Sequence, residues 1–370
     1  MQKNKVLKKI GKGLLIALLA IIVVVGSYAA YFVGSFTRIE PDMALVPTVG
    51  KSENQVSTNI QYNLLNWNIG FGAYSDDFSF FMDGGKYSRA FSEEEVNKNL
   101  LGVKQTVENA SKTHGKGYFD FICYQEVDFD STRSYHVDQR AVLSSFHQGY
   151  SSVYAQNYAS PYIMYPIFSP HGANNSGLYT FSRYKINSSL RVQLPIEKGF
   201  TKFFDLDRCY SKSRISVANG KDLVLINLHL SAYTSDGTIS TTQLEMLLAD
   251  CKAEYEKGNY VICAGDYNKD LVDEGSASLF GSLGEQDNWA KQIDPAIFID
   301  THMTKVAPLN KENPITTCRN ASAPYSEGNT LYIIDGFLVS DNVTVLKALA
   351  IDAQFKNSDH NPVVLSFKLK

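Results

Sequence analysis

Acidic, amide and imidazole side chains follow or precede apolar, strand-like runs at several places in this chain. In the stretch NSDHNPVVLSF, Asp359 and His360 stand directly before an apolar run near the C-terminus. Strand ends of a sandwich meet at a rim, where such groups can converge without burying unpaired charge in the core. The pattern therefore indicates one shared polar site. The other positions of this kind are Asn68, Glu126, His229, Asp266, Asn268 and Asp335.

These residue types together can carry out metal-assisted attack on phosphorus. A hard divalent cation prefers oxygen ligands, which Glu126 supplies, with Asn68 and Asp359 nearby. Such a cation neutralises a phosphate oxygen and helps the leaving oxygen depart. An imidazole becomes a good base or charge stabiliser when a carboxylate fixes its tautomer, and Asp335 could do this for His360.

The remaining three polar residues complete this chemistry. Asp266 can hold or deprotonate a water for in-line attack, while Asn268 and His229 can hydrogen-bond the transition-state oxygens. Each residue taken singly also has a structural explanation, as a turn former, a solvated acid or a satisfied core histidine. The hypothesis of a phosphoryl-transfer site thus rests on their joint occurrence.

Short apolar, β-prone runs and two amphipathic helices must position these residues. A capping box at Ser92 and Glu95 predicts the start of one helix, and residues 241–256 have leucines at helical spacing. Both helices lead directly into apolar strands, which predicts an α/β sandwich. Strands are predicted at 62–69, 119–124, 177–182, 213–217, 223–230, 260–264, 331–339 and 363–369.

The first forty residues form a separate segment. Five lysines lie within residues 1–12, and residues 13–36 carry no charge. As a helix, this run is long enough to cross the ~30 Å hydrocarbon layer. A cleaved signal peptide, with Ser27, Tyr28 and Ala29 at the cleavage site, is the alternative. We favour an uncleaved anchor because the apolar run continues past that site.

This reading predicts a single-pass protein of the cell membrane. The basic tail, 1–12, stays in the cytoplasm, so the chain after the anchor at 13–36 lies outside. A polar stalk is expected at 37–59, followed by one large domain at 60–370.

Charge and cysteine content argue against some classes of function. Of the 35 Lys/Arg and 38 Asp/Glu, the first 50 residues hold six and two, so the rest holds 29 and 36, a net charge of −7. An acidic domain is a poor candidate for tracking a polyphosphate backbone. The five cysteines form no CxxC pair, which argues against a zinc site, and the surroundings of Cys123 and Cys263 predict buried thiols.

The order of the polar motifs resembles that of the endonuclease/exonuclease/phosphatase superfamily, which is related to DNase I. The resemblance spans residues 60–369 and implies a four-layer α/β/β/α sandwich. It also implies hydrolysis of phosphate esters that depends on Mg²⁺, with Mn²⁺ as an alternative. The motifs are, in order, Asn68, Glu126 in QE, His229 in HL, Asp266-x-Asn268, Asp335 in IDGFLVS, and Ser358-Asp359-His360.

Roles for individual residues follow from this resemblance. It implies Glu126 as a metal ligand with Asn68 in the metal shell, and Asp266 as the water-activating acid. It further implies a pairing of Asp335 with His360. The phosphate contacts would be Asn268 and His229. The chain departs from many members at Ile333, where an Arg or Thr is common two residues before the aspartate.

Substrate choice is expected to depend on three loops, 71–91, 128–140 and 158–177. Arg133 and His136 in the second loop and Tyr165 in the third are candidate substrate contacts. The aromatic loops could instead cover a flank of the sandwich, stack on bases, or dip into a lipid interface. Arg133 could equally form a surface ion pair.

Members of the superfamily cut DNA, RNA, phosphoinositides or sphingomyelin, so the resemblance alone does not select a substrate. The membrane tether beside an acidic domain favours a phospholipid-like or small phosphodiester. Two alternatives are an extracellular nuclease on DNA or RNA, and a catalytically silent surface module that binds a phosphorylated ligand.

Overall fold

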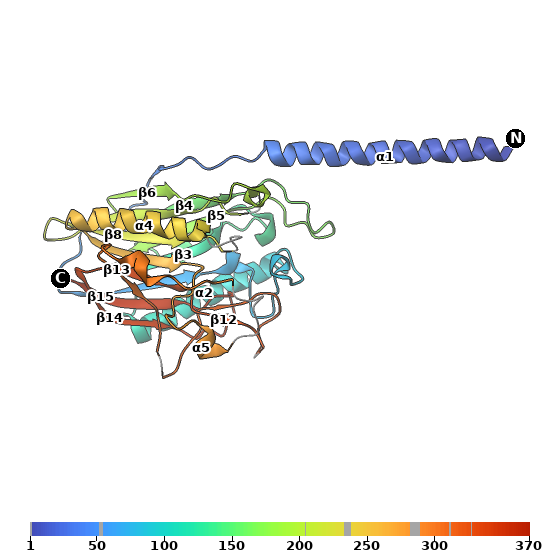
Figure 1. The fold of residues 1–370 in the computed structure, drawn as a ribbon. Coiled ribbons are helices and arrows are strands. Elements are labelled where there is room, and N and C mark those ends of the chain that lie inside the picture. Colours follow the sequence, from blue (N-terminus) through green and yellow to red (C-terminus); the bar gives the residue numbers. More distant parts are fainter. Residues whose placement is uncertain are drawn as a thin grey trace.

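The computed structural model describes residues 2–51, 55–203, 205–232, 238–281, 289–310, 312–326 and 328–370. Two β-sheets pack face to face, and helices cover both outer faces (Figure 1). The α/β/β/α sandwich predicted from the sequence is therefore confirmed. One sheet contains, in spatial order, β1 (Ala44–Leu45), β6 (Ser188–Gln193), β7 (Cys209–Ser216), β8 (Asp222–His229), β9 (Tyr260–Asp266), β13 (Asp335–Ser340) and β10 (Met303–Val306).

The second sheet has six strands and carries the C-terminal strand near its edge. A separate two-stranded ribbon pairs β11 (Cys318–Arg319) with β12 (Leu331–Tyr332). The six strands are, in spatial order, β14 (Val343–Ala350), β15 (Val363–Leu369), β2 (Gln61–Asn68), β3 (Phe121–Asp128), β5 (Asn175–Ser182) and β4 (Ser151–Ala159).

Side-chain alternation along the strands divides the apolar residues among three layers. Ile262 and Ala264 of β9 face the other sheet, whereas Val261 and Cys263 face helix α4 (Thr238–Glu256). On the other outer face, α2 (Glu93–His114) and α3 (Gln139–Phe146) cover the second sheet. Because both faces of β9 are buried, this central strand is almost entirely apolar up to Asp266. All five cysteines are buried and free, as predicted for Cys123 and Cys263.

Both predicted helices are present, and a local capping signal starts α2. The backbone N–H of Glu95 donates to the Ser92 hydroxyl at 3.2 Å, so Ser92 caps α2. Helix α4 begins at Thr238, three residues before the predicted start. A short helix, α5 (Ala277–Phe280), lies beside β12.

Strand direction brings six strand ends to one rim. β2 pairs with β3, and β8 with β9, in parallel, so all four carboxyl ends point the same way. β13 runs antiparallel to β9, and β15 antiparallel to β2, so their amino ends meet the same rim. The sheets pack against each other through β2, β3, β8 and β9. Polar residues at these ends therefore converge.

Two segments differ from their predicted form. The predicted strand 331–339 is split into β12 and β13, because the N–H of Ile333 bonds to Ser276 Oγ and that of Ile334 to Thr317 Oγ1 instead of continuing one ladder. Within the expected stalk, 37–59, the short strand β1 packs on the domain, where it pairs with β6 in an antiparallel ladder. The side chain of Arg38 also forms an ion pair with Asp207.

Helix α1 (Gln2–Gly34) is the long blue helix that extends from the sandwich in Figure 1. An 18-residue window within its segment Lys3–Gly34 has a mean hydropathy of 2.5, and none of that window is buried in the protein. The helix is long and apolar enough to cross a membrane.

Candidate active site

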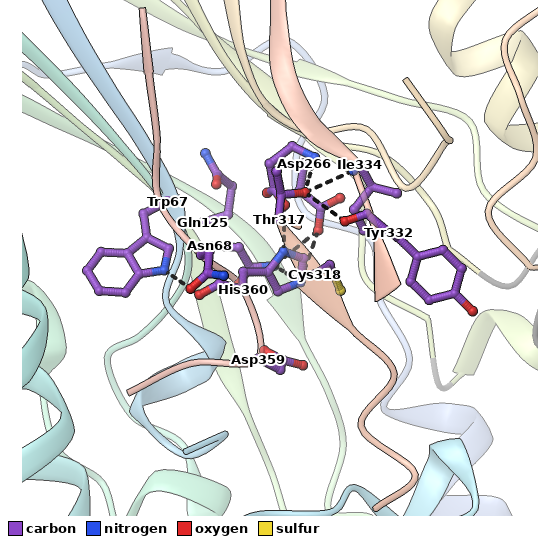
Figure 2. A network of polar contacts seen from close by, with 12 residues as sticks. Trp67, Asn68, Gln125, Asp266, Thr317, Cys318, Tyr332, Ile334, Asp359 and His360 are labelled. Atoms are coloured by element: carbon purple, nitrogen blue, oxygen red, sulfur yellow. Dashed lines mark hydrogen bonds and ion pairs between the residues drawn. The ribbon is translucent and has the colours of Figure 1, made fainter. Parts of the chain in front are cut away.

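A chain of buried polar groups begins at the amino end of β13. Asp335 Oδ2 lies 2.8 Å from His360 Nδ1, and His360 Nε2 lies 3.8 Å from Asp266 Oδ2 at the end of β9. Asp335 and Asp266 are direct partners across the β9–β13 ladder. Figure 2 shows Asp266 and His360 facing each other across the end of the two sheets. The ladder register thus brings two sequence-predicted acids to one imidazole.

Asn68 and His229 close this arrangement from the neighbouring strands. Asn68, the last residue of β2, donates from Nδ2 to Asp266 Oδ2 at 3.1 Å. His229, the last residue of β8, places Nε2 3.4 Å from the same oxygen and 4.0 Å from Glu126 Oε1. Asp266 Oδ1 accepts from the backbone N–H of Asn268 at 2.9 Å. The structure brings all these predicted residues together.

A β-bulge points Glu126 into the site. The β3–β5 register shifts between Tyr124 and Val127, and Glu126 has a φ of 57°. A bulge redirects side chains near functional sites, and a positive φ is strained for a residue with a Cβ. The local backbone therefore turns Glu126 out of the strand alternation and toward the cavity that Asp359 also lines.

The Glu126 carboxylate fits a metal ligand. Its Oε2 is buried and has no hydrogen-bond partner. Burial, together with the nearby negative charge of Asp359, raises the pKa of Glu126 to about 8. A buried acid with an unpaired oxygen and an acidic neighbour is what a hard cation would compensate. The donor chemistry of the residues thus agrees with the metal predicted from the resemblance.

A different trio, Asp266, Asp335 and His360, also offers possible ligand atoms within 4.8 Å of one another. In this trio His360 Nδ1 is already hydrogen-bonded to Asp335. That bond occupies Nδ1, whereas Nε2 remains 3.8 Å from Asp266 Oδ2. The trio and the unpaired Oε2 of Glu126 are thus two candidate positions for a cation.

The two histidines of the rim have opposite protonation tendencies. Burial alone would lower the pKa of His360, but the Asp335 carboxylate raises it well above its usual value. Burial, the Arg208 guanidinium and His360 lower the pKa of His229 well below its usual value. His360 is therefore cationic near neutral pH and His229 is neutral. Burial and the charge of Asp335 also raise the pKa of Asp266 to about 7.

Backbone contacts fix the position of His360. Trp67 Nε1 donates to its carbonyl oxygen at 2.8 Å, and its own N–H donates to Ser358 Oγ at 3.1 Å. The Ser358 hydroxyl in turn donates to the carbonyl of Asn68 at 2.8 Å. Asp359 points away from His360 in Figure 2 and lines the same cavity. These bonds hold the rim independently of any ligand.

The rim opens into a cavity of about 170 Å³. Besides the residues already described, its lining includes three arginines, Arg133, Arg208 and Arg319. One nitrogen of Arg208, Nη1, is buried without a hydrogen-bond partner. The prediction did not include Arg208, which directly precedes β7, or Arg319, which ends β11, because neither strand end lies in an apolar run. The aromatic part of the lining consists of Phe71, Tyr74, Phe80, Tyr158, His171 and Trp289.

The three candidate substrate contacts have different positions. Arg133 lines the cavity, but its Nε and Nη2 bond to Asp128 at 3.0 and 2.9 Å. Arg133 therefore forms an ion pair, as the alternative expected, but the pair is buried and not on the surface. His136 is exposed, and its Nδ1 lies 2.6 Å from Asp130 Oδ1. Tyr165 is exposed and lines a surface pocket together with residues of helix α1. Neither His136 nor Tyr165 is part of the cavity lining.

Comparison with known proteins gives structural matches only. No protein-family model matches the sequence, and no curated protein matches it. The endonuclease/exonuclease/phosphatase from Beutenbergia cavernae DSM 12333 superposes with a TM-score of 0.57 at 18% identity, over 84% of this chain and 72% of that chain.

Two further solved structures superpose over most of the chain. ANGEL2, a 2',3'-cyclic phosphatase in complex with adenosine-2',3'-vanadate, has a TM-score of 0.53 at 14% identity, over 88% of this chain and 99% of that chain. A family protein from Leptotrichia buccalis C-1013-b has a TM-score of 0.53 at 13% identity, over 83% and 100%. The chain thus has the fold of the endonuclease/exonuclease/phosphatase superfamily, the DNase I-like fold.

Proposed function

We propose that the protein is a membrane-tethered, extracytoplasmic phosphodiesterase that uses a divalent cation, Mg²⁺ or Mn²⁺, to hydrolyse its substrate by in-line attack of water. The observation that carries this proposal is the polar chain from Asp335 through His360 to Asp266, placed beside the unpaired carboxylate oxygen of Glu126. Glu126, Asp266 and His360 line one cavity, so a single phosphate could contact all three, with Asp335 hydrogen-bonded to His360 Nδ1.

Each residue has a role that its geometry supports. Asp266, with a raised pKa of about 7, accepts the proton of the attacking water. The cationic His360 donates a hydrogen bond to a phosphoryl oxygen, and Asp335 keeps its ring oriented through Nδ1. Neutral His229 and Asn268 bind the remaining oxygens. Three of these side chains lie at strand ends, so they are pre-organised.

The cation would be held by Glu126, with Asn68 and Asp359 near it. When bound, it supplies charge stabilisation to the phosphate oxygens. Asn68 Oδ1 accepts from the N–H of Gly70 at 3.0 Å, and Nδ2 bonds to Asp266. Through Nδ2, Asn68 therefore orients the Asp266 carboxylate on the water-activating side of the site.

The proposed location follows from α1. Five lysines precede its apolar run, so the N-terminus would remain in the cytoplasm and the domain 60–370 would face outward. Free buried cysteines are compatible with export because burial protects the thiols.

The test uses the full chain in detergent, supplied with Mg²⁺, with Mn²⁺ or with EDTA. DNA, RNA, phospholipids and a water-soluble aryl phosphodiester are offered in parallel. We expect metal-dependent cleavage of a phosphodiester that His360→Ala abolishes. His302→Ala is the matched control, because His302 is exposed and its Nδ1 lies 3.0 Å from Asp341, at the opposite end of β13 from Asp335.

Metal-independent cleavage, or full activity in His360→Ala, would refute the mechanism. A folded full chain that cleaves none of the four substrate classes would favour the alternative of a silent module that binds a phosphorylated ligand. Equal loss in His302→Ala and His360→Ala would show that the effect is structural.

A further inference from the structure

An apolar loop, residues 161–169, extends from the domain beside α1. The loop contains no Asp, Glu, Lys or Arg. Its side chains Ile167 and Phe168 project into solvent, with Ile167 75% exposed and Phe168 fully exposed. Met164 and Tyr165 are also exposed. Consecutive exposed apolar side chains of this size indicate a surface that is covered by another apolar phase.

The loop packs against the last turns of α1. Val25, Phe32 and Val33 of the helix line an apolar cavity of about 330 Å³ together with Ile163 and Ile167 of the loop. The hydrogen bonds between the two segments come from tyrosines of α1. Tyr28 Oη donates to the carbonyl of residue 162 at 3.0 Å and accepts from the N–H of residue 164 at 3.1 Å. Tyr31 Oη accepts from the N–H of residue 162 at 3.2 Å.

The position of these contacts along α1 determines how deep the loop would lie in the membrane. From Val33 back to Val25 the helix advances about 12 Å at 1.5 Å per residue. If the apolar run begins to cross the membrane after Lys12, a ~30 Å layer ends near residue 32. The contact segment then lies in the outer half of the hydrocarbon layer. The loop that touches it must lie at the same depth.

Four of the seven backbone N–H groups of the loop, those of residues 162, 163, 164 and 169, have partners within the described part of the protein. Non-helical chain can lie at membrane depth only where its polar groups have partners within the protein. Two N–H groups of the loop bond to α1, and that of Ile163 bonds to the carbonyl of Gly172 at 3.0 Å. The N–H of Ser169 bonds to the carbonyl of Pro166 at 3.1 Å, and the prolines at 161 and 166 have no N–H.

The base of the loop borders the active-site cavity. The Tyr165 ring lies 5.8 Å from the Phe81 ring, which lies 5.6 Å from His171. His171 lines the cavity together with Phe80. In Figure 1 the C-terminus, where β15 ends, lies on the left and α1 extends to the right. The helix thus extends toward the side on which β15 begins, which is the side of the rim.

We propose that residues 161–169 insert into the outer leaflet beside α1 and hold the mouth of the cavity at the level of the lipid headgroups, so that the substrate is a phosphodiester of a membrane lipid. The part that concerns the substrate rests on the proposed function. The part that concerns insertion rests on the loop and on α1 as a membrane anchor.

Insertion is measured with the full chain in phosphatidylcholine vesicles whose acyl chains carry bromine, which quenches nearby tryptophan. Phe168→Trp places a reporter at the loop tip, and the parent protein corrects for Trp67 and Trp289. Leu346→Trp is the matched control, because Leu346 is an exposed leucine on β14, on the side of the molecule away from α1 in Figure 1. We expect strong quenching of the reporter at 168 and little at 346. Equal quenching at both positions, or none at 168, would overturn the insertion.

Substrate delivery is measured with the double variant Ile167→Ser, Phe168→Ser and with Leu346→Ser as control. We expect the double variant to hydrolyse vesicle phospholipid about ten-fold more slowly than the parent while it hydrolyses a water-soluble aryl phosphodiester at the parental rate. Parental rates on both substrates would overturn the delivery role.

The experiments distinguish a failure of the lipid-substrate inference from a failure of the proposed phosphodiesterase function. A parent protein that cleaves the aryl diester but no lipid would overturn the lipid substrate and leave the phosphodiesterase intact. A parent protein that cleaves neither would overturn the proposed function, and the quenching result would still decide the insertion.

Discussion

Two carboxylates in different regions of the molecule, Glu254 on α4 and Glu126 at the rim, have opposite surroundings. Glu254, on α4, accepts from Arg214 Nη2 at 2.6 Å, from Lys257 Nζ at 3.0 Å and from Asn259 Nδ2 at 2.8 Å. Burial alone would raise the pKa of Glu254, but these bonds lower it to about 2. At the rim, burial and like charge raise the pKa of Glu126 to about 8.

The difference distinguishes a structural acid from a functional one. A carboxylate with several donors stabilises the folded state, because its charge is better satisfied there than in the unfolded chain. A carboxylate with an unpaired oxygen and acidic neighbours destabilises the folded state, and it persists where a ligand or reaction uses it. Substitutions in the two regions should therefore have opposite effects on stability and on turnover.

Asp266→Asn should have the largest effect. The amide keeps the size of the side chain but cannot accept the proton of water, so kcat should fall by about 10³-fold. The substitution should leave the free energy of unfolding unchanged or raise it at pH 8, because a buried charge is removed. Turnover and urea unfolding measured on the same preparation check both parts, and loss of both activity and stability would contradict the comparison.

Asp266 should also make the free energy of unfolding depend on pH. With a folded pKa of about 7 against a usual value of 3.8, Asp266 binds a proton more tightly in the folded state. Its contribution therefore favours folding at low pH and is lost as the pH rises from about 4 to about 7. In EDTA, the free energy of unfolding of the parent should therefore decrease between about pH 4 and about pH 7. Asp266→Asn should lack this decrease.

Glu126→Gln should chiefly change the dependence on metal. The neutral amide is a weaker ligand, so the Mg²⁺ concentration for half-maximal turnover should rise about a hundred-fold. Stability in EDTA should not fall, because the unpaired oxygen contributes no hydrogen bond. An unchanged Mg²⁺ titration would exclude Glu126 as a ligand. Asp83→Asn, at another acid that lines the cavity, serves as the control.

The sequence predicts the rim well because strand ends are local features. An apolar run followed by a polar residue marks the end of a strand whatever its partners, and parallel pairing then brings Asn68 and His229 to the same side as Asp266. Arg208 carries no such signal, because the start of β7 that it directly precedes is not an apolar run. The direction of Tyr165 depends on its docking against α1, which no local pattern encodes.

Edge strands are the other part of the fold that the sequence did not predict. Along β14 only the first and last residues are buried, so its apolar pattern is weak. Two residues within the predicted strand 331–339 give a different limit: Ile333 and Ile334 continue an apolar run, although their N–H groups leave the ladder for Ser276 and Thr317. Hydrogen bonds to distant hydroxyls divide this run, and hydrophobic periodicity does not report them.

Glu254→Gln should act in the opposite sense to Asp266→Asn. The amide keeps the shape but loses the charge-assisted bonds to Arg214 and Lys257, so the free energy of unfolding should fall by about 2 kcal/mol at pH 7. Because the folded pKa of about 2 lies below the usual value of 4.5, the contribution of Glu254 is present above pH 4.5 and is lost as the pH falls toward 2. Turnover should be unchanged, and a loss of specific activity in the folded variant would contradict the structural role.

Lys257→Met should have the smallest effect and shows whether the partners of Glu254 contribute equally. The Lys257 side chain is 60% exposed, whereas Arg214 is 28% exposed, so water already screens more of the Lys257 interaction. Removal of Lys257 should lower the free energy of unfolding by about 0.5 kcal/mol, and high salt should reduce the difference from the parent. Arg214→Met leaves the same carboxylate with its weaker charged partner and should therefore destabilise more. Equal losses of unfolding free energy in the two variants would contradict this ranking. They would mean that the net charge around Glu254, and not the burial of each bond, determines how much this acid stabilises the fold.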